Sequence, residues 1–322
     1  MPRPIGQIAF AAAVLAPNYN FLPGIEVEIE GLDRIPREPV IFAMNHTDRF
    51  NYFPFMYRLW RQESRYMTVW VKGKYYETAA TGMFMELTSN IPTVSRGYII
   101  TKDFTLTMGR RPTEAEYYTL RARVNAEADP DSDPSSVDVS QISQNLLLTK
   151  RDILGVQFDP NREPYARGIN NVFAAMMREF VKLNERSFDL GLDLLVFPQG
   201  TRSVRLLPGR IGMMEIALRY QKTIVPIGCN GCDLVYQGSL PIAKKGKVVY
   251  RVGEPICYDE LSEFHIDEPF DPFSAEAEHK HRDKFQGAVD LVMNRINDLV
   301  DPEYQFSDDL KSTGVRGTSR FI

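Results

Sequence analysis

Cysteine is scarce in this sequence, which has three in 322 residues: Cys229, Cys232 and Cys257. So few cysteines exclude the disulfide framework that supports many small secreted domains. Cys229 and Cys232 have the C-x-x-C spacing, but a zinc site would need two further ligands and a redox motif would need its own fold. We therefore expect reduced thiols in a cytoplasmic protein and no metal site. We also expect no bound cofactor.

An excess of charge of either sign is also absent. The chain has 38 Lys and Arg residues against 42 Asp and Glu residues, a formal net charge of −4. Nucleic-acid-binding proteins usually carry a strong basic field, so this balance argues against nucleic acid as a partner. Any anion-binding site must therefore be local.

Long apolar runs are missing as well. The N-terminal apolar stretch, residues 5–16, is far shorter than the about 20 residues that span a bilayer. Pro17 follows where a signal peptide would have its small-residue cleavage site. We expect neither a transmembrane helix nor a signal peptide, and we interpret residues 1–24 as an apolar segment that packs on the domain or lies on a membrane.

Apolar residues make up 43% of the chain, enough for a full core. Apolar strands alternate with helical segments, which predicts an α/β domain with a single mainly parallel, mixed sheet flanked by helices. The expected strands are 25–30, 39–44, 65–72, 91–97, 192–197, 223–227 and 248–252, and the expected helices lie near 52–60, 78–87, 172–191, 211–220 and 279–300.

One region interrupts this alternation. Residues 129–136 are acidic and rich in proline, which predicts a mobile loop. We interpret the surrounding segment, about 98–170, as an insertion in an α/β domain that covers 25–260. Residues 261–322 are expected to form a C-terminal helix and tail packed on that domain.

Three candidate site segments each follow an expected strand: His46 after 39–44, Arg96 at the end of 91–97, and the turn 199–203 after 192–197. Ligands of parallel α/β sheets lie beyond the carboxyl ends of the strands, so these segments are expected to share one cleft. A neutral histidine there can act as a general base. The other histidines, His265, His279 and His281, are interpreted as solvated surface residues.

The turn Gln199-Gly200-Thr201-Arg202-Ser203 suits an oxyanion. Its glycine permits close approach of the backbone, and its hydroxyls and guanidinium can donate hydrogen bonds. Taken alone, such a turn is more often a plain connection between a strand and a loop.

Four segments resemble, in order, the four motifs of the PlsC-like glycerolipid acyltransferase family. They are Asn45-His46, the strand ending in Arg96, Phe197–Ser203 and Ile224–Ile227, and the match covers roughly residues 25 to 260. The resemblance implies an O-acyltransferase that moves a fatty acyl group from acyl-CoA or acyl carrier protein, as co-substrate, to the hydroxyl of a lysophospholipid such as lysophosphatidic acid. It also implies a peripheral location at the inner face of the membrane.

By the same resemblance, His46 is the base, and Arg96 with Gln199, Gly200, Thr201 and Arg202 holds the phosphate of the acceptor. The sequence departs from the family pattern at two positions. Gln199 stands where the family has Glu, which keeps hydrogen-bonding capacity and removes a negative charge.

The second departure lies five residues after the histidine, where the family has Asp and this chain has Asn51. Either Asp48 or Asn51 is expected to orient His46. We place Asp48 first because its charge would stabilise the imidazolium, whereas an Asp-to-Asn change in a Ser-His-Asp triad lowers kcat about 10⁴-fold. The competing interpretation of Asp48 is a helix N-cap.

These departures keep a second function open, a catalytically reduced lipid-binding protein of the same fold. A third is an acyl thioesterase, in which water replaces the acceptor. The aromatic segment from Tyr52 to Trp60 has two interpretations as well: core packing, or a surface that enters the membrane or lines an acyl channel.

Overall fold

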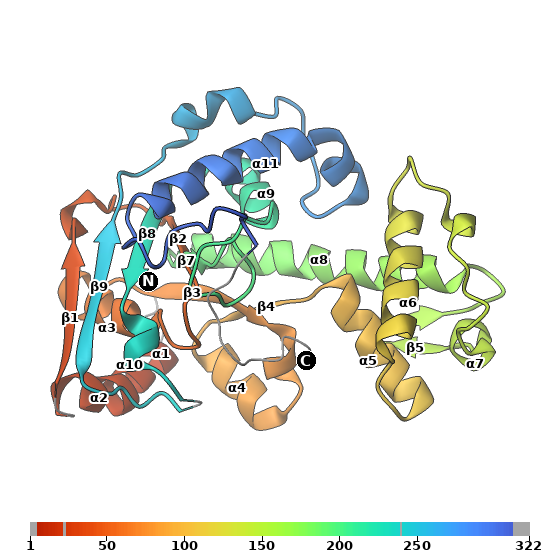
Figure 1. Cartoon of the computed structure of the whole chain (residues 1–322), viewed down its shortest axis with the longest axis horizontal. Coiled ribbons are helices and arrows are strands. Elements are labelled where there is room, and N and C mark those ends of the chain that lie inside the picture. Colours follow the sequence, from red (N-terminus) through yellow and green to blue (C-terminus); the bar gives the residue numbers. More distant parts are fainter. Residues whose placement is uncertain (1–4, 22–23, 239, 312–322) are drawn as a thin grey trace. The chain divides into compact units, whose positions relative to one another are not determined.

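A seven-stranded sheet is the framework of the protein in the computed structural model, which describes residues 5–21, 24–238 and 240–311 (Figure 1). The strand order is β1-β9-β8-β2-β7-β3-β4. β2 runs parallel to β7 and β8, β3 to β7, and β1 to β9, whereas β8 and β9 are antiparallel. The mainly parallel, mixed sheet expected from the sequence is therefore confirmed. Its strands are β1 (Ile25–Glu30), β2 (Ile41–Met44), β3 (Met67–Lys72), β4 (Ile91–Thr93), β7 (Asp193–Val196), β8 (Ile224–Asn230) and β9 (Gly246–Val252).

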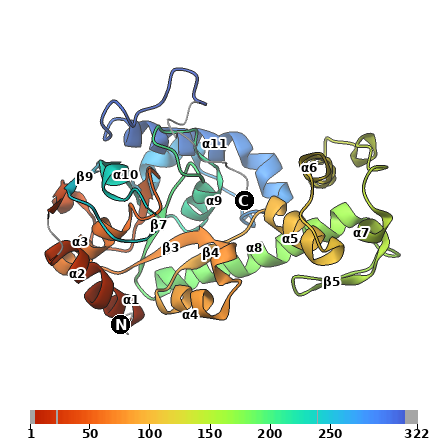
Figure 2. The same ribbon diagram turned by 60° about the horizontal axis from the view of Figure 1, so that its bottom comes forward.

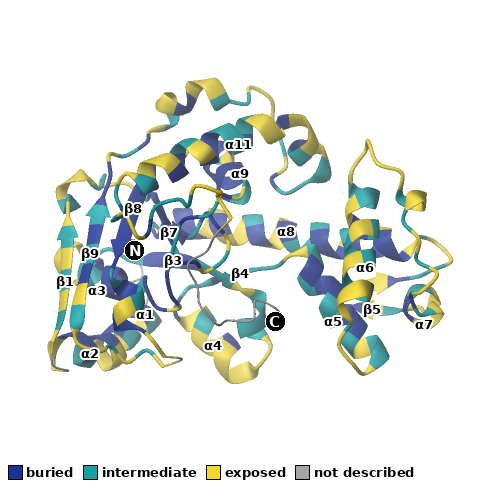
Figure 3. Ribbon diagram, viewed as in Figure 1, coloured by how far each residue is buried: buried dark blue, intermediate teal, exposed yellow. Residues whose placement is uncertain are grey.

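Burial explains the sequence of each strand. All residues of β2, β7 and β8 are buried, and their nearly continuous apolar runs are typical of central parallel strands covered on both faces (Figure 3). The edge strand β1 alternates half-buried isoleucine or valine with exposed glutamate. Its wet face is charged, which opposes pairing with another sheet edge.

The chain divides into two compact units, and the first takes in the described parts of residues 1–91, 184–269 and 282–322. Among the described residues, no helix is long and apolar enough to cross a membrane. Figure 2 shows α1 beside α4. The first unit contains α1 (Ile5–Phe10), α2 (Ala16–Asn20), α3 (Phe53–Glu63), α4 (Ala79–Leu87), α9 (Gly212–Arg219) and α10 (Cys232–Val235), with a π-helical turn (Ala11–Leu15) between α1 and α2 and short 3₁₀ turns at Leu32–Arg34, Gly73–Tyr76 and Tyr258–Phe264.

Helix α3 packs its aromatic face into the core of this unit. The rings of Phe42 on β2 and Phe55 on α3 meet edge to face at 5.3 Å, and Phe55 also contacts Tyr250 of β9. Of the Tyr52–Trp60 segment, only Tyr52, Arg58 and Trp60 are not fully buried. Core packing is therefore the main role of this segment.

The second unit comprises residues 92–183 and 270–281, so it contains the whole segment 98–170. Residues 129–136 form exposed turns in which Asp129 and Asp133 accept hydrogen bonds from nearby backbone N–H groups. The elements of this unit are α5 (Arg96–Met108), α6 (Glu114–Ala128), a 3₁₀ turn (Pro134–Ser136), α7 (Gln144–Leu148) and the antiparallel hairpin β5 (Arg151–Ile153) and β6 (Val156–Phe158), and α8 (Tyr165–Asp189) and α11 (Ala275–Asn297) each belong to both units.

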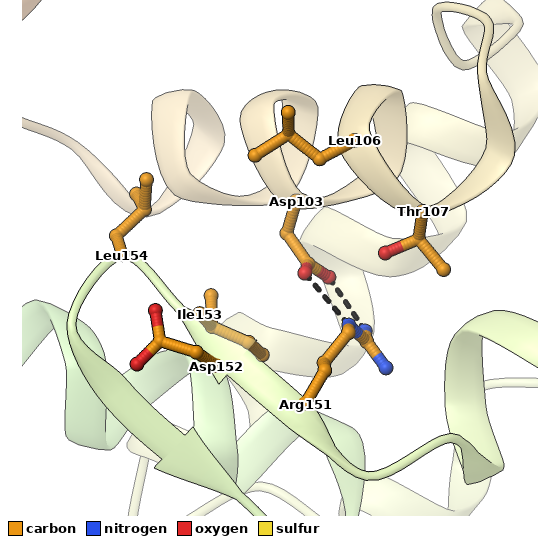
Figure 4. A pocket seen from close by; sticks show the side chains of 7 residues that line it. All are labelled: Asp103, Leu106, Thr107, Arg151, Asp152, Ile153 and Leu154. Carbon is orange, nitrogen blue, oxygen red and sulfur yellow. Dashed lines mark hydrogen bonds and ion pairs between the residues drawn. The ribbon is translucent and has the colours of Figure 1, made fainter.

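A buried ion pair joins α5 to this hairpin. Arg151 donates two hydrogen bonds to the carboxylate of Asp103, at 2.8 and 2.7 Å, and the Tyr165 hydroxyl donates a third at 3.0 Å. The pair borders a pocket of about 250 Å³ that is also lined by Leu106 and Leu154 (Figure 4). No residue of the predicted site lines this pocket.

The strand expected over 91–97 is shorter in the structure. β4 ends at Thr93, and the side chain of Ser95 caps α5 by accepting a hydrogen bond from the N–H of Tyr98 at 3.2 Å. Arg96 is therefore the first residue of a helix rather than the last of a strand. The serine was the signal for this boundary, because Ser is a favoured N-cap residue.

We expect Asp103→Ala to destabilise the second unit by about 3 kcal/mol, because it removes the buried carboxylate that pairs with the half-buried Arg151 guanidinium. Urea unfolding followed by circular dichroism measures this change. The matched control is Lys150→Met, which removes an exposed ion pair to Asp159 and should cost no more than about 1 kcal/mol. Equal losses for the two variants would contradict a structural role for the buried pair.

Candidate active site

The site lies at the edge where four parallel strands end. β2 ends before His46, β3 ends with Lys72, β7 ends before the turn that starts at Phe197, and β8 ends at Asn230. Because β2, β3, β7 and β8 run in the same direction, the residues that follow them gather at this edge.

His46 is held through Nδ1, which lies 3.1 Å from Oδ1 of Asn51. Asn51 is fully buried, and its Nδ2 donates to the carbonyl oxygen of Asn45 at 2.7 Å. The amide nitrogen of Asn51 thus has its acceptor, so the oxygen faces the ring and Nδ1 must carry the proton. This tautomer leaves Nε2 unprotonated, as a general base requires.

The surroundings keep the His46 ring neutral. The pKa of His46 is lowered from 6.5 to about 3, mainly by burial and in addition by the positive charges of Arg202 and Lys72, against the opposing effect of the Asn51 hydrogen bond. Near neutral pH the imidazole is therefore ready to accept a proton. Taking that proton is costly, however, because no carboxylate contacts the ring among the described residues.

Asp48 does not orient His46, and our preference for it over Asn51 was wrong. Its carboxylate accepts hydrogen bonds from the backbone N–H of Phe50 at 2.7 Å and from the hydroxyl of Thr47 at 3.0 Å. Asp folds back onto its own backbone in this way in tight turns. Nor does Asp48 cap α3, whose N-cap position is Tyr52. Burial raises the pKa of Asp48 to about 6 despite these hydrogen bonds.

Two buried contacts fix the backbone of the turn. The side chain of Asn45 pairs with the backbone of Cys229 on β8, accepting from its N–H at 2.7 Å and donating to its carbonyl oxygen at 2.9 Å. The hydroxyl of Tyr250 on β9 donates to the carbonyl oxygen of Asn51 at 2.6 Å. The two strands thus hold the residues on either side of His46.

The turn after β7 supplies the remaining contacts. The ring of Phe197 stacks on the imidazole, with centroids 3.9 Å apart and planes at 14°. The carbonyl oxygen of His46 accepts from the N–H of Ser203 at 2.8 Å, and its N–H donates to Oε1 of Gln199 at 3.3 Å. Gln199, buried in the turn, also donates to the carbonyl oxygen of Thr201 at 3.0 Å. Gln199 therefore braces the turn.

Gly200 lets this turn close. Its φ of +69° lies in the left-handed region, where a residue with a side chain would be strained. Arg202 follows on the surface, and within the described ranges its side chain forms no hydrogen bond or ion pair.

Lys72 and Lys74 are functional candidates that the sequence analysis missed. Burial lowers the pKa of Lys72, and the neighbouring charges of Lys74 and Arg202 lower it further. Lys72 and Arg202 also both act on His46. Lys72 and Arg202 thus act on the base, and Lys74 acts on Lys72; we call these three side chains the cationic cluster. Its signal in the sequence was a lysine at the end of a core strand, at the same edge as His46.

Arg96 belongs to the second unit. Its Nε donates to Oδ1 of Asn170 at 2.8 Å, and its guanidinium lies 4.2 Å from the centre of the Phe173 ring. That Arg96 shares one cleft with His46 stays a prediction.

The cysteines and the remaining histidines lie outside the predicted chemistry. All three cysteines are free, and Cys229 and Cys232 are buried. Across the described residues, one group brings three possible metal ligands together: Asp129, Asp131 and His279, all exposed in the second unit.

Comparison with known proteins finds a partial sequence match and one structural similarity. No protein family model matches the chain. A 1-acyl-sn-glycerol-3-phosphate acyltransferase of Cocos nucifera is 34% identical over 74 residues, which are 22% of this chain and 24% of that protein. The chain thus matches about a quarter of that relative. This match supports the resemblance to the PlsC-like family seen in the four motifs.

One solved structure is also similar. It is the crystal structure of the 1-acyl-sn-glycerophosphate (LPA) acyltransferase PlsC from Thermotoga maritima, with a TM-score of 0.42 and 12% sequence identity over 91% of this chain and 77% of that chain.

We expect the His46 ring to stay neutral from pH 8 down to pH 5, because its pKa is about 3. Histidine-selective NMR measures this titration. In Asn51→Asp, a carboxylate beside Nδ1 should raise the midpoint, since an opposite charge favours the imidazolium. A midpoint near 6.5 in the unaltered protein, or no change in Asn51→Asp, would contradict the geometry described.

Proposed function

We propose that this chain is an O-acyltransferase of the PlsC-like type that moves a fatty acyl group from acyl-CoA or acyl carrier protein to a lysophospholipid such as lysophosphatidic acid. The observation that carries the proposal is a neutral histidine, held at Nδ1 so that Nε2 is unprotonated, with Arg202 and Lys72 acting on it. The base can take the proton of the acceptor hydroxyl, and the cations can bind the acceptor phosphate.

In the proposed reaction, Nε2 of His46 takes the proton of the acceptor hydroxyl as its oxygen attacks the thioester carbonyl. The C–O bond forms, and a tetrahedral intermediate carries the negative charge on the former carbonyl oxygen. As the C–S bond breaks, the imidazolium returns the proton to the leaving sulfur. The products are an ester and a thiol, and His46 is neutral again.

Each remaining site residue has a proposed part. Asn51 keeps Nε2 free by holding the proton on Nδ1. Arg202 and Lys72 hold the acceptor phosphate. Gln199, Gly200 and Thr201 shape the turn that presents Arg202.

A catalytically reduced lipid-binding protein is the second candidate, favoured by the neutral Asn51 beside His46. It would bind lysolipid without transferring the acyl group. The third candidate, a thioesterase, would release free fatty acid from the donor when no lysolipid is present.

We expect His46→Ala to lower acyl transfer by about 10² to 10⁴-fold, the usual worth of a general base, while lysolipid binding is kept. Thiol release from acyl-CoA, measured with lysophosphatidic acid and a thiol reagent, tests this. His279→Ala, on an exposed histidine of the second unit, is the control. Transfer that is absent from the unaltered protein, or equal in His46→Ala, would overturn the proposal.

Arg202→Ala should raise the KM for lysophosphatidic acid at least about tenfold, since a hydrogen bond to a charged group contributes about 1.5–3 kcal/mol. The control is Arg37→Ala, an exposed arginine that precedes β2 and so lies at the opposite edge of the sheet. An unchanged KM in Arg202→Ala would remove Arg202 from the phosphate site.

We also propose that this edge of the sheet meets an anionic membrane surface. β1 and β9 start where β8 ends, so the segments before them emerge beside the candidate site. They carry the exposed apolar side chains of Phe21, Leu240 and Ile242, followed by the exposed Lys244 and Lys245. Apolar side chains combined with basic ones bind anionic bilayers. A peripheral location at the inner face of the membrane fits this surface.

Replacing Leu240 and Ile242 by Ser should lower binding to vesicles that contain phosphatidylglycerol at least tenfold, because about 0.8 kcal/mol is lost for each CH₂ group no longer buried. Co-sedimentation measures binding. The control is Leu106→Ser in the second unit, another strongly exposed leucine. Unchanged binding in the double variant would contradict the proposed surface.

A further inference from the structure

The charged groups around His46 are positive, which disfavours the imidazolium that the proposed reaction forms. The groups that act on the ring are Asn51 from its own turn, Arg202 from the turn after β7 and Lys72 from the end of β3. The nearest acid in the sequence, Asp48, is occupied by Thr47 and Phe50. A protonated His46 would therefore face two cations and one neutral amide.

An anion held by those cations reverses the balance. A phosphate group carries a charge of about −1.5 to −2 at neutral pH, which is enough to neutralise Arg202 and Lys72. The exposed Arg202 forms no hydrogen bond or ion pair among the described residues, and its positive charge and that of Lys72 repel each other. The cationic cluster is thus electrostatically incomplete until an anion binds.

We propose that a phosphate on the bound acceptor, held by Arg202 and Lys72, supplies the negative charge that Asn51 does not bring to His46. This inference rests on the proposed function. The positive ring exists only between attack of the hydroxyl and departure of the thiol, and the acceptor phosphate is present throughout that interval. Asn51 is then a positioning residue that also determines specificity, because a neutral amide makes the reaction depend on a phosphate-bearing acceptor.

Two kinetic arms test the dependence. Transfer is measured with lysophosphatidic acid and with the monoacylglycerol of the same chain, which has the same hydroxyl chemistry and no phosphate. The unaltered protein should prefer lysophosphatidic acid in kcat/KM at least about 100-fold. Asn51→Asp should narrow this preference at least about tenfold by raising kcat for monoacylglycerol, because the carboxylate now supplies the charge. An equal preference for lysophosphatidic acid over monoacylglycerol in the unaltered protein and in Asn51→Asp would overturn the inference.

A second comparison, between two acyl donors, distinguishes the phosphate of the acceptor from the phosphates of the donor. The same comparison is made with acyl-CoA and with an acyl-N-acetylcysteamine thioester, which has no phosphate. The preference for lysophosphatidic acid should be the same with both donors. A preference that changes tenfold or more with the donor would assign the role to the phosphates of the donor and overturn the inference.

A direct readout needs neither turnover nor a variant at position 51. Glycerol 3-phosphate added to the unaltered protein should raise the NMR titration midpoint of His46 by at least about one pH unit, the effect of a nearby opposite charge. The rise should be lost in Arg202→Ala and kept in Arg37→Ala. No rise in the unaltered protein would overturn the inference, whereas a rise without any acyl transfer would overturn only the proposed function.

Discussion

Two hydrogen bonds between the Asn45 side chain and the backbone of Cys229 are the constraint on which the site depends. They tie the turn after β2 to the neighbouring strand at the point where both strands leave the core. With Asn45 fixed, its carbonyl oxygen sets the direction of the Asn51 amide, and that amide sets the proton on Nδ1 of His46. This chain of hydrogen bonds, which starts at the sheet, thus determines the tautomer of His46.

The titratable and charged side chains of the site are placed by the ends of three different strands. The base follows β2, a lysine ends β3 and an arginine follows β7. Parallel pairing alone brings these side chains together, since no two of them are close in sequence. β2 and β7 are buried along their whole length, so charged side chains of these segments lie at the edge where the chain leaves the sheet.

Much of the first unit could be predicted from the sequence. Its central strands β2, β7 and β8 are continuous apolar runs and its edge strand β1 alternates strictly, and both patterns favour strands when they are short. The second unit was harder, because α6 has no apolar stripe that marks a helix, and β5 and β6 have only three residues each. The boundary at Arg96 was missed because the capping Ser95 lay inside a stretch that reads as a strand.

Within the site, His46 and the turn 199–203 were found from their positions after strands. The choice between Asp48 and Asn51 was not decided by position, because charge favoured one residue and geometry the other. The course of the chain from 48 to 51 returns the asparagine to the ring and turns the aspartate towards its own backbone. Lys72 was missed because its signal, a lysine at the end of a core strand, does not by itself indicate a functional residue.

Because Phe197 stacks on His46, the turn after β7 has two roles. One short segment forms the wall that fixes the plane of the base and, five residues later, presents Arg202. A gain or loss of one residue between them would disturb both parts at once. The positions of Phe197 and Arg202 can therefore change only together. The length of this turn should thus be far less variable in evolution than the identity of its side chains.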